Sequence, residues 1–155
     1  MMERKEMVQH PQHYVSHPSG VECIEIIRHY TCDIANAQKY LWRAGLKEEE
    51  GMTQRQKEIE DCHKAIWYLR DYMQNAAKVQ RITVSKLPPH PSGVDCEAIA
   101  SFYCEEIAQA FREIWFVGLI VDGVLIRPRG EMTQVFRAIR AIERHIVKLL
   151  KKDEG

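Results

Sequence analysis

The residues best suited to chemistry lie between positions 34 and 47, where an amide, several cations and a tyrosine are spaced along one segment. If this segment is helical, Asn36, Lys39, Tyr40 and Arg43 occupy positions i, i+3, i+4 and i+7 and project from one face. Cations beside an aromatic ring suit an anionic group attached to a flat base. A stripe of Lys and Arg is more often a solvated helix face, so a binding site would require a second polar surface opposite this one.

A second polar stripe on the next predicted helix could form that opposing surface. Lys57, Asp61, Lys64, Tyr68 and Asp71 follow one another at steps of four and three, on one face of the next predicted helix. If this face opposes the first stripe, the two enclose a groove lined by cations, carboxylates and aromatic rings. Whether they meet depends on the helices that carry them.

Capping residues and apolar periodicity set the first helix boundaries. Residues 1–10 are polar and are predicted to form a disordered tail. Ser19 and Glu22 have the S-x-x-E form of a capping box, which predicts a helix from there to about residue 30. Asp33 is predicted to cap the next helix, and Gly45 to end it.

Further along the chain, Thr53 and Gln56 form a second capping-box pattern, which predicts a long helix to about residue 79. The last helix is predicted from about 133 to 151. Between these helices, apolar β-forming residues flank Asp122 and Gly123, a pair favoured in two-residue type I′ turns. The sequence therefore predicts a small β-hairpin there.

The chain contains an internal repeat. Residues 90–94 copy the His-Pro-Ser-Gly-Val of residues 17–21, and the same offset of 73 matches Trp42 to Trp115. Neither copy buries much by itself. We therefore predict an all-α fold in which two tandem copies of a helix, helix, long helix unit share one core with pseudo-twofold symmetry. The predicted segments are the tail at 1–10, the first copy at 11–79, a linker at 80–89, and a degenerate second copy with the hairpin insertion at 90–152.

The two copies agree at apolar positions and differ along the polar stripes. Matched positions share backbone demands, so a polar set present in only one copy indicates chemistry that only that copy keeps. The replacements, first copy before second, are Asn36 by Gln109, Lys39 by Arg112, Tyr40 by Glu113, Arg43 by Phe116, Asp61 by Ala141 and Trp67 by Val147. We therefore expect the binding site in the first copy.

Composition limits the function classes. Lys plus Arg and Asp plus Glu are 22 each, so no basic field exists to hold duplex nucleic acid or an anionic membrane. No segment is long and apolar enough to span a bilayer, and we expect a cytoplasmic protein. Five cysteines without C-x-x-C spacing are expected to be reduced thiols. No metal ligands are assigned, because prolines interrupt the group of His10, His13 and His17.

Four blocks of the first copy resemble a known family. They are the Pro-Gln-His-Tyr of 11–14, the Gly-Val-Glu of 20–22, residues 36–45 and residues 60–69. Together they resemble the P-x-H-Y, G-x-E, G-N-A-x-K-Y-x-x-R-A-G and E-D-L-x-K-A-x-x-Y-L pattern of small phage proteins, described as a family of unknown function or as a phage nucleotide kinase. The resemblance spans about residues 11–73 and departs from the pattern at Ala35, Leu46 and Cys62. It implies nucleotide binding in the cytoplasm of an infected bacterial host.

A nucleoside monophosphate kinase is the function that this resemblance favours, with Mg²⁺ and ATP as cofactors. The G-x-x-x-x-G-K-[ST] phosphate loop is absent, so side chains must neutralise the phosphates. We expect cations to hold phosphate, aromatic rings to stack on the base, and carboxylates to orient a ribose or hold Mg²⁺ through water. No catalytic residue is assigned. The predicted ligand-binding residues are His13, Tyr14, Glu22, Asn36, Lys39, Tyr40, Arg43, Lys47, Asp61, Lys64, Trp67 and Tyr68.

Other functions fit the same pattern. The protein could sequester a nucleotide immune signal without turnover, as a homo-oligomeric anti-defence protein. It could also be a Mg²⁺-dependent all-α nucleotide pyrophosphohydrolase, because Glu22-x-x-Glu25 and Glu58-x-x-Asp61 place paired carboxylates at helical spacing. A helical scaffold without a ligand is the simplest alternative.

Overall fold

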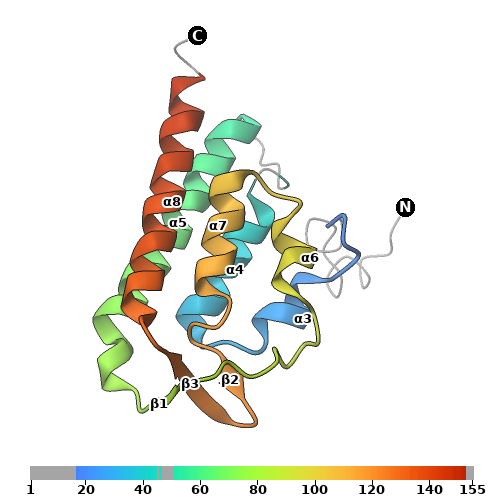
Figure 1. Ribbon diagram of the computed structural model, residues 1–155. Helices are drawn as coiled ribbons and strands as arrows, with labels where there is room; N and C mark the ends of the chain where they lie inside the picture. The colour runs from blue at the N-terminus through green and yellow to red at the C-terminus, as the bar shows by residue number, and fades with distance from the viewer. Residues whose placement is uncertain (1–16, 45, 47–50, 153–155) are drawn as a thin grey trace.

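Long helices dominate the molecule, which is described by a computed structural model over residues 17–44, 46 and 51–152. The helices α4, α5, α7 and α8 lie side by side, and a small sheet lies at one end of this bundle (Figure 1). In chain order the elements are α3 (Cys23–Ile27), α4 (Cys32–Arg43), α5 (Gln54–Asn75), η1 (Ala76–Lys78), β1 (Ile82–Val84), α6 (Cys96–Ala100), α7 (Glu105–Ile114), β2 (Ile120–Val121), β3 (Val124–Pro128) and α8 (Glu131–Lys151).

Helix α5 begins as the sequence predicts. The Thr53 hydroxyl accepts a hydrogen bond from the Gln56 amide at 3.1 Å, and the Gln56 side chain accepts one from the Thr53 amide at 2.8 Å. This reciprocal box satisfies amides that a helix start leaves open. The α-helix ends at Asn75, and the 3₁₀ turn η1 extends it close to the predicted end.

Two other predicted caps are wrong. Helix α3 is capped by Glu22 and Glu25 rather than by Ser19, because the Ser19 hydroxyl is used in the preceding turn, where it accepts from the Val21 amide at 3.1 Å. Helix α4 has Thr31 at its N-cap, and Asp33 lies inside the first turn. The predicted helix end at Gly45 lies outside the described residues.

The all-α prediction needs correcting, because the fold is mostly helical with a small three-stranded sheet of order β1-β3-β2. The predicted hairpin is confirmed: β2 and β3 pair antiparallel, and Asp122 (φ 50°) and Gly123 (φ 77°) take the positive φ angles of a type I′ turn. Strand β1, within the segment predicted as a linker, pairs parallel with β3.

A buried carboxylate fastens this end of the bundle. Glu131, at the start of α8, is 1% exposed and accepts from Arg81 at 2.7 and 2.8 Å. Tyr72 of α5 also donates to Glu131, and Arg127 of β3 lies 3.3 Å from it. Hydrogen bonds and ion pairs from α5, β3 and the segment before β1 compensate for the loss of water around this carboxylate.

Both halves contribute to one buried core. Their apolar side chains form a single cluster, and within the described residues no helix combines the length and the hydropathy that a bilayer span requires. Full burial of one such side chain stabilises the fold by roughly 1.5–3 kcal/mol. Among its largest fully buried members are Ile26, Ile34, Leu41, Trp42, Leu69, Ile99, Ile107, Phe111, Ile114, Leu119 and Ile142.

The two His-Pro-Ser-Gly-Val segments form turns with the same hydrogen bonds. The amide of Ser19 donates to His17 Nδ1 at 3.1 Å, and the amide of Ser92 donates to His90 Nδ1 at 3.1 Å. In each turn the serine hydroxyl lies 2.7 Å from the same ring nitrogen. Because a backbone amide can only donate, Nδ1 is the acceptor in both neutral rings and Nε2 carries the hydrogen.

Tyrosines link the two halves crosswise. The Tyr30 hydroxyl donates to the carbonyl of Trp115, and the Tyr103 hydroxyl donates to the carbonyl of Trp42 at 2.7 Å. Tyr30 also lies 2.9 Å from Nε2 of His90. Each half therefore completes hydrogen bonds of the other.

Candidate functional site

The cations predicted along α4 are positioned by its apolar side. Ile34, Ala37 and Leu41 are fully buried in the core. Lys39 and Tyr40 are therefore directed away from the centre of the core, and both are half-buried. Helix α4 packs along α5, so this polar side lies beside the polar side of α5. The two predicted stripes do meet.

An aromatic pair surrounded by cations is the first part of the site. The rings of Tyr40 and Tyr68 stack with centroids 5.9 Å apart and planes at 14°. Lys39, Arg43 and Lys64 lie 4.9, 5.1 and 5.4 Å from the centroid of the Tyr40 ring. We call these five residues the cationic ring cluster. Cation–π attraction to one ring helps hold three positive charges together.

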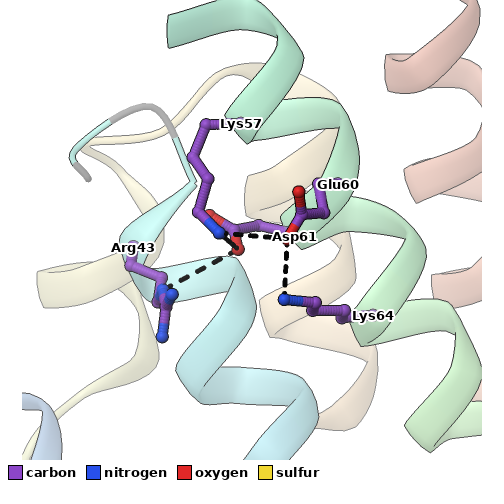
Figure 2. A network of polar contacts seen from close by, with 5 residues as sticks. All are labelled: Arg43, Lys57, Glu60, Asp61 and Lys64. Carbon is purple, nitrogen blue, oxygen red and sulfur yellow. Dashed lines mark hydrogen bonds and ion pairs between the residues drawn. The ribbon is translucent and has the colours of Figure 1, made fainter. Parts of the chain in front are cut away.

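A buried carboxylate anchors two of the nearby cations. Asp61 is fully buried, and its Oδ1 lies 3.7 Å from Arg43 Nε and 3.6 Å from Lys57 Nζ (Figure 2). Both distances are longer than an ordinary hydrogen bond, and neither carboxylate oxygen has a closer donor among the described residues. Burial raises the pKa of Asp61, while the charges of Arg43, Lys57 and Lys64 oppose that rise.

Glu60 completes the network at the surface. It accepts from Lys64 at 2.8 Å and from Lys57 at 3.2 Å, and these bonds lower the pKa of the Glu60 carboxyl (Figure 2). Among the described residues of this network four cations face two carboxylates, which is an excess of two positive charges. This excess stands out in a chain whose formal net charge is zero.

Most of the described candidates come together at this face. Lys39, Tyr40, Arg43, Lys64 and Tyr68 form the cationic ring cluster, and Asp61 lies beneath Arg43. Trp67 is 61% exposed, and its ring meets Tyr68 edge-on at 5.0 Å. An exposed tryptophan beside the cluster offers a further stacking surface for a base.

Other candidates serve the helices instead or are not described. The Asn36 amide donates to the carbonyl of Cys32 at 2.9 Å, one turn back on its own helix. Glu22 takes part in the capping box of α3. Burial raises the pKa of its neighbour Cys23 to about 12, and the charges of Lys39 and Arg43 oppose that rise. The predicted residues His13, Tyr14 and Lys47 lie outside the described part of the chain.

Lys57 belongs to the site although it was not among the predicted ligand-binding residues. It is 2% exposed and contacts both Asp61 and Glu60. A signal was present, because Lys57 stands four residues before Asp61 in the same stripe. Its burial could not be read from the sequence, because lysine is rarely buried without a partner.

The carboxylates predicted for Mg²⁺-dependent hydrolysis have separate partners. Glu22 and Glu25 cap α3, and Glu58 accepts from His145 Nε2 at 2.8 Å. Asp61 faces Arg43 and Lys57. Among the described residues, these four carboxylates do not converge on a common point where a metal ion could sit.

Residues 8–70 match the model of a protein family of unknown function, DUF3310. The matched region contains α3, α4 and most of α5, and therefore all of the cationic ring cluster, and it stops before the second half of the chain. No curated protein and no solved structure matches the chain. The first half of the chain is thus similar to a family whose description names no activity.

Proposed function

We propose that the protein binds a nucleotide on the paired polar faces of α4 and α5, with a nucleoside monophosphate as the first candidate. The convergence of Lys39, Arg43 and Lys64 on the Tyr40 ring carries this proposal. A phosphate monoester carries about 1.5 to 2 negative charges at pH 7. That matches the local excess of two positive charges in the network.

We expect different residues to bind the phosphate and the base: the cations of the cationic ring cluster bind the phosphate, and Trp67 binds the base. Lys39 and Lys64 are half-buried, so their ammonium groups can reach a phosphate at the surface. Arg43 is 7% exposed and is held against Asp61, which favours one geometry for any contact made by the outer guanidinium nitrogens. The exposed Trp67 ring, next to Tyr68, is the surface on which we expect the base to stack.

Binding is tested by calorimetry on the full chain with a panel of nucleoside mono-, di- and triphosphates and cyclic dinucleotides. The Lys64→Ala variant should bind at least about tenfold more weakly, since a charged hydrogen bond contributes roughly 1.5–3 kcal/mol. Arg70→Ala is the matched control, because Arg70 lies on the same helix, is exposed, and pairs with Glu143 of α8. Equal losses in both variants, or no binding to any member of the panel, would contradict the proposal.

Arg43→Lys gives a second measurement, because the charge beside Asp61 is kept while the planar guanidinium is lost. We expect affinity for the nucleotide to fall by about 1.5 to 3 kcal/mol if Arg43 contacts phosphate in bidentate fashion. An unchanged dissociation constant would remove Arg43 from the binding surface and leave it a structural role.

Turnover is a separate question, which a second experiment decides. The protein is incubated with ATP, Mg²⁺ and a labelled nucleotide that it binds, then denatured, and the nucleotides are separated. A labelled product with one more phosphate supports nucleotide kinase activity. Unchanged nucleotide in stoichiometric amount supports sequestration of a signalling nucleotide, the second function that the same surface fits.

We further propose that the two halves are tandem copies related by a pseudo-twofold axis. The identical turn hydrogen bonds at His17 and His90, and the crosswise bonds of Tyr30 and Tyr103, support this relation. In this arrangement the first half keeps the nucleotide surface and the second half supplies much of its supporting core.

The biological setting follows from the resemblance to phage proteins, and we propose the cytoplasm of an infected bacterium as the place of action. We also propose a homo-oligomer as the working form. The outer side of α8 exposes Phe136, Val147 and Leu150, about half of each side chain, which gives an apolar stripe for self-association. Sedimentation of the purified chain tests the oligomer directly.

A further inference from the structure

A second polar cluster lies on the other side of α5. A cavity of about 340 Å³ is lined by apolar side chains that include Tyr103, Ile107 and Leu149, together with a thiol, an imidazole and a carboxylate from Cys104, His145 and Glu58. Cys104 is exposed at the N-cap of α7, His145 is 7% exposed on α8, and Glu58 belongs to α5. None of these residues takes part in the proposed nucleotide surface.

We propose that Cys104, Glu106 and His145 form a binding site for a divalent transition-metal ion of the zinc type. One ligand atom from each of the three residues falls within 4.8 Å of the others. A thiolate, an imidazole and a carboxylate are a ligand set that zinc takes in proteins. This site is independent of the proposed function in nucleotide binding.

The spacing of the two best-defined ligand atoms fits a tetrahedral ion. Cys104 Sγ lies 3.5 Å from His145 Nδ1. With Zn–S of about 2.3 Å and Zn–N of about 2.0 to 2.1 Å, two ligands at a tetrahedral angle lie roughly 3.5 Å apart. An ion can therefore be placed between these two atoms without moving either helix.

Glu58 gives His145 the orientation that metal binding needs. His145 Nε2 lies 2.8 Å from Glu58 Oε1. Since a carboxylate accepts, Nε2 carries the hydrogen, and in the neutral ring Nδ1 is left with a lone pair facing Cys104. Metal-binding histidines commonly donate their second nitrogen to a carboxylate in this way, and such partners raise metal affinity. Glu58 is thus a positioning residue for the proposed site.

Lys148 competes with the metal ion for Glu106. Its ammonium group donates to Glu106 Oε1, which leaves the second carboxylate oxygen for a metal ion. The Lys148 side chain is 60% exposed, so it can turn into solvent at little cost. With three protein ligands, the fourth position of a tetrahedral ion is open, and it adjoins the cavity that Cys104 and His145 line.

Sequence reasoning missed this site because no short motif marks it. Cys104 and His145 are 41 residues apart, and Glu58 is 87 residues from His145. The corresponding positions of the first half carry Thr31, Asp33 and Ala65, so the internal repeat gives no second example. Only the packing of α5, α7 and α8 brings the three side chains together.

The test uses the full chain, stripped of metal and kept reduced, with Zn²⁺ in calorimetry and Co²⁺ as a spectroscopic probe. His10 and His13 are first changed to glutamine, so that the histidine-rich N-terminal segment adds no signal. We expect one ion per chain, with the visible bands of tetrahedral Co²⁺ and a charge-transfer band from a thiolate. Absence of uptake would overturn the proposal.

Variants assign the ligands. Cys104→Ser should abolish the thiolate band and weaken zinc binding strongly. Glu58→Gln should lower affinity by roughly 10- to 100-fold while keeping the band, as expected for a partner of a ligand. Cys32→Ser is the matched control, because Cys32 is also exposed at the start of a helix, and its Sγ contacts an amide instead of a histidine.

Two results would contradict the proposed metal site. If metal binding and the thiolate band survive Cys104→Ser, or if Cys32→Ser reduces them as much, the three residues are not the site. Circular dichroism and thermal unfolding of each metal-free variant confirm that it is folded. His145→Gln is measured in the same way and tests whether His145 is the second ligand.

Discussion

The helix pairs α4–α5 and α7–α8 solve the same packing problem with different chemistry. At equivalent sequence positions the first pair has Arg43 and the fully buried Asp61, and the second pair has Phe116 and the fully buried Ala141. The second pair packs without an ion pair at this level, so helix packing alone does not require one. Buried ion pairs often contribute little net stability. The ion pair between α7 and α8 joins Glu106 to an exposed Lys148 instead. A fully buried carboxylate beside Arg43 is therefore particular to the first pair, and it fits the proposed ligand.

The largest effect is expected from removing the Asp61 carboxylate, which lies beside both Arg43 and Lys57. Asp61→Ala leaves Arg43 buried without its counter-ion and removes one of the carboxylates beside the buried Lys57, and we expect a loss of about 3–5 kcal/mol in the free energy of unfolding. The double variant Asp61→Ala, Arg43→Phe copies the residues of the second pair and should recover part of that loss. Urea unfolding measures both. If the double variant is no more stable than the single one, the ions are integral to the packing of α4 on α5.

Acid should reveal a difference between the two equivalent histidines. Burial, helped by the charge of His29, lowers the pKa of His90 to about 4, and burial alone lowers the pKa of His17. At each of these histidines the unfolded chain therefore binds a proton before the folded chain does, so their contribution to stability falls as pH drops from about 6.5 to about 4. The His90 part of this fall is roughly 3 kcal/mol.

The His90 prediction is checked by urea unfolding at several pH values. His90→Gln should remove most of that fall, and His17→Gln should also reduce it. His63→Gln, on the exposed side of α5, is the control and should leave the profile unchanged. A profile for His90→Gln that coincides with the wild-type profile would show that His90 is not the group responsible.

A smaller difference in stability is expected between the two crosswise tyrosines. Tyr30 has two partners, the Trp115 carbonyl and His90, whereas Tyr103 has the Trp42 carbonyl. Tyr30→Phe should cost about 2 kcal/mol and Tyr103→Phe about 1 kcal/mol, because each lost bond leaves a buried partner unsatisfied. Thermal unfolding measures both, and equal costs would mean that the bond to His90 adds nothing.

The smallest effect is expected at Glu60, an exposed partner of two lysines. Glu60→Gln should change the free energy of unfolding by less than about 0.5 kcal/mol. The same change removes a negative charge from the network, so nucleotide binding should tighten by about twofold at low salt. Glu143→Gln, an exposed carboxylate paired with Arg70 and Arg140, is the control for both measurements.

Local signals predicted much of the fold. The Thr53 capping box and the Asp122-Gly123 turn are confirmed, because both depend on residues a few positions apart. Strand β1 was not predicted, since residues 82–84 become a strand only by pairing with β3, more than forty positions away. The Ser19 box was wrong because a serine hydroxyl can serve a turn as readily as a helix.

The candidate site was likewise predicted only in part from local signals. Periodicity correctly placed Lys39, Arg43 and Lys64 where they could converge, because steps of three and four define a helix face. It did not show that Asn36 would bond back to its own helix, since a short amide beside a backbone carbonyl has that local option at any such position. The burial of Lys57 depends on the distance between α4 and α5, and the spacing of residues along the sequence does not give that distance.

The exchanged tyrosine bonds make the two halves depend on each other as subunits do. A chain cut after residue 79 would retain Tyr30 but lose its acceptor at Trp115, and the carbonyl of Trp42 would lose its donor. A single half would have to recover these bonds from another molecule, and the free-energy cost of that association rises as the protein is diluted. Covalent linkage removes that cost, so the assembly should persist at concentrations where a dimer of separate halves would fall apart.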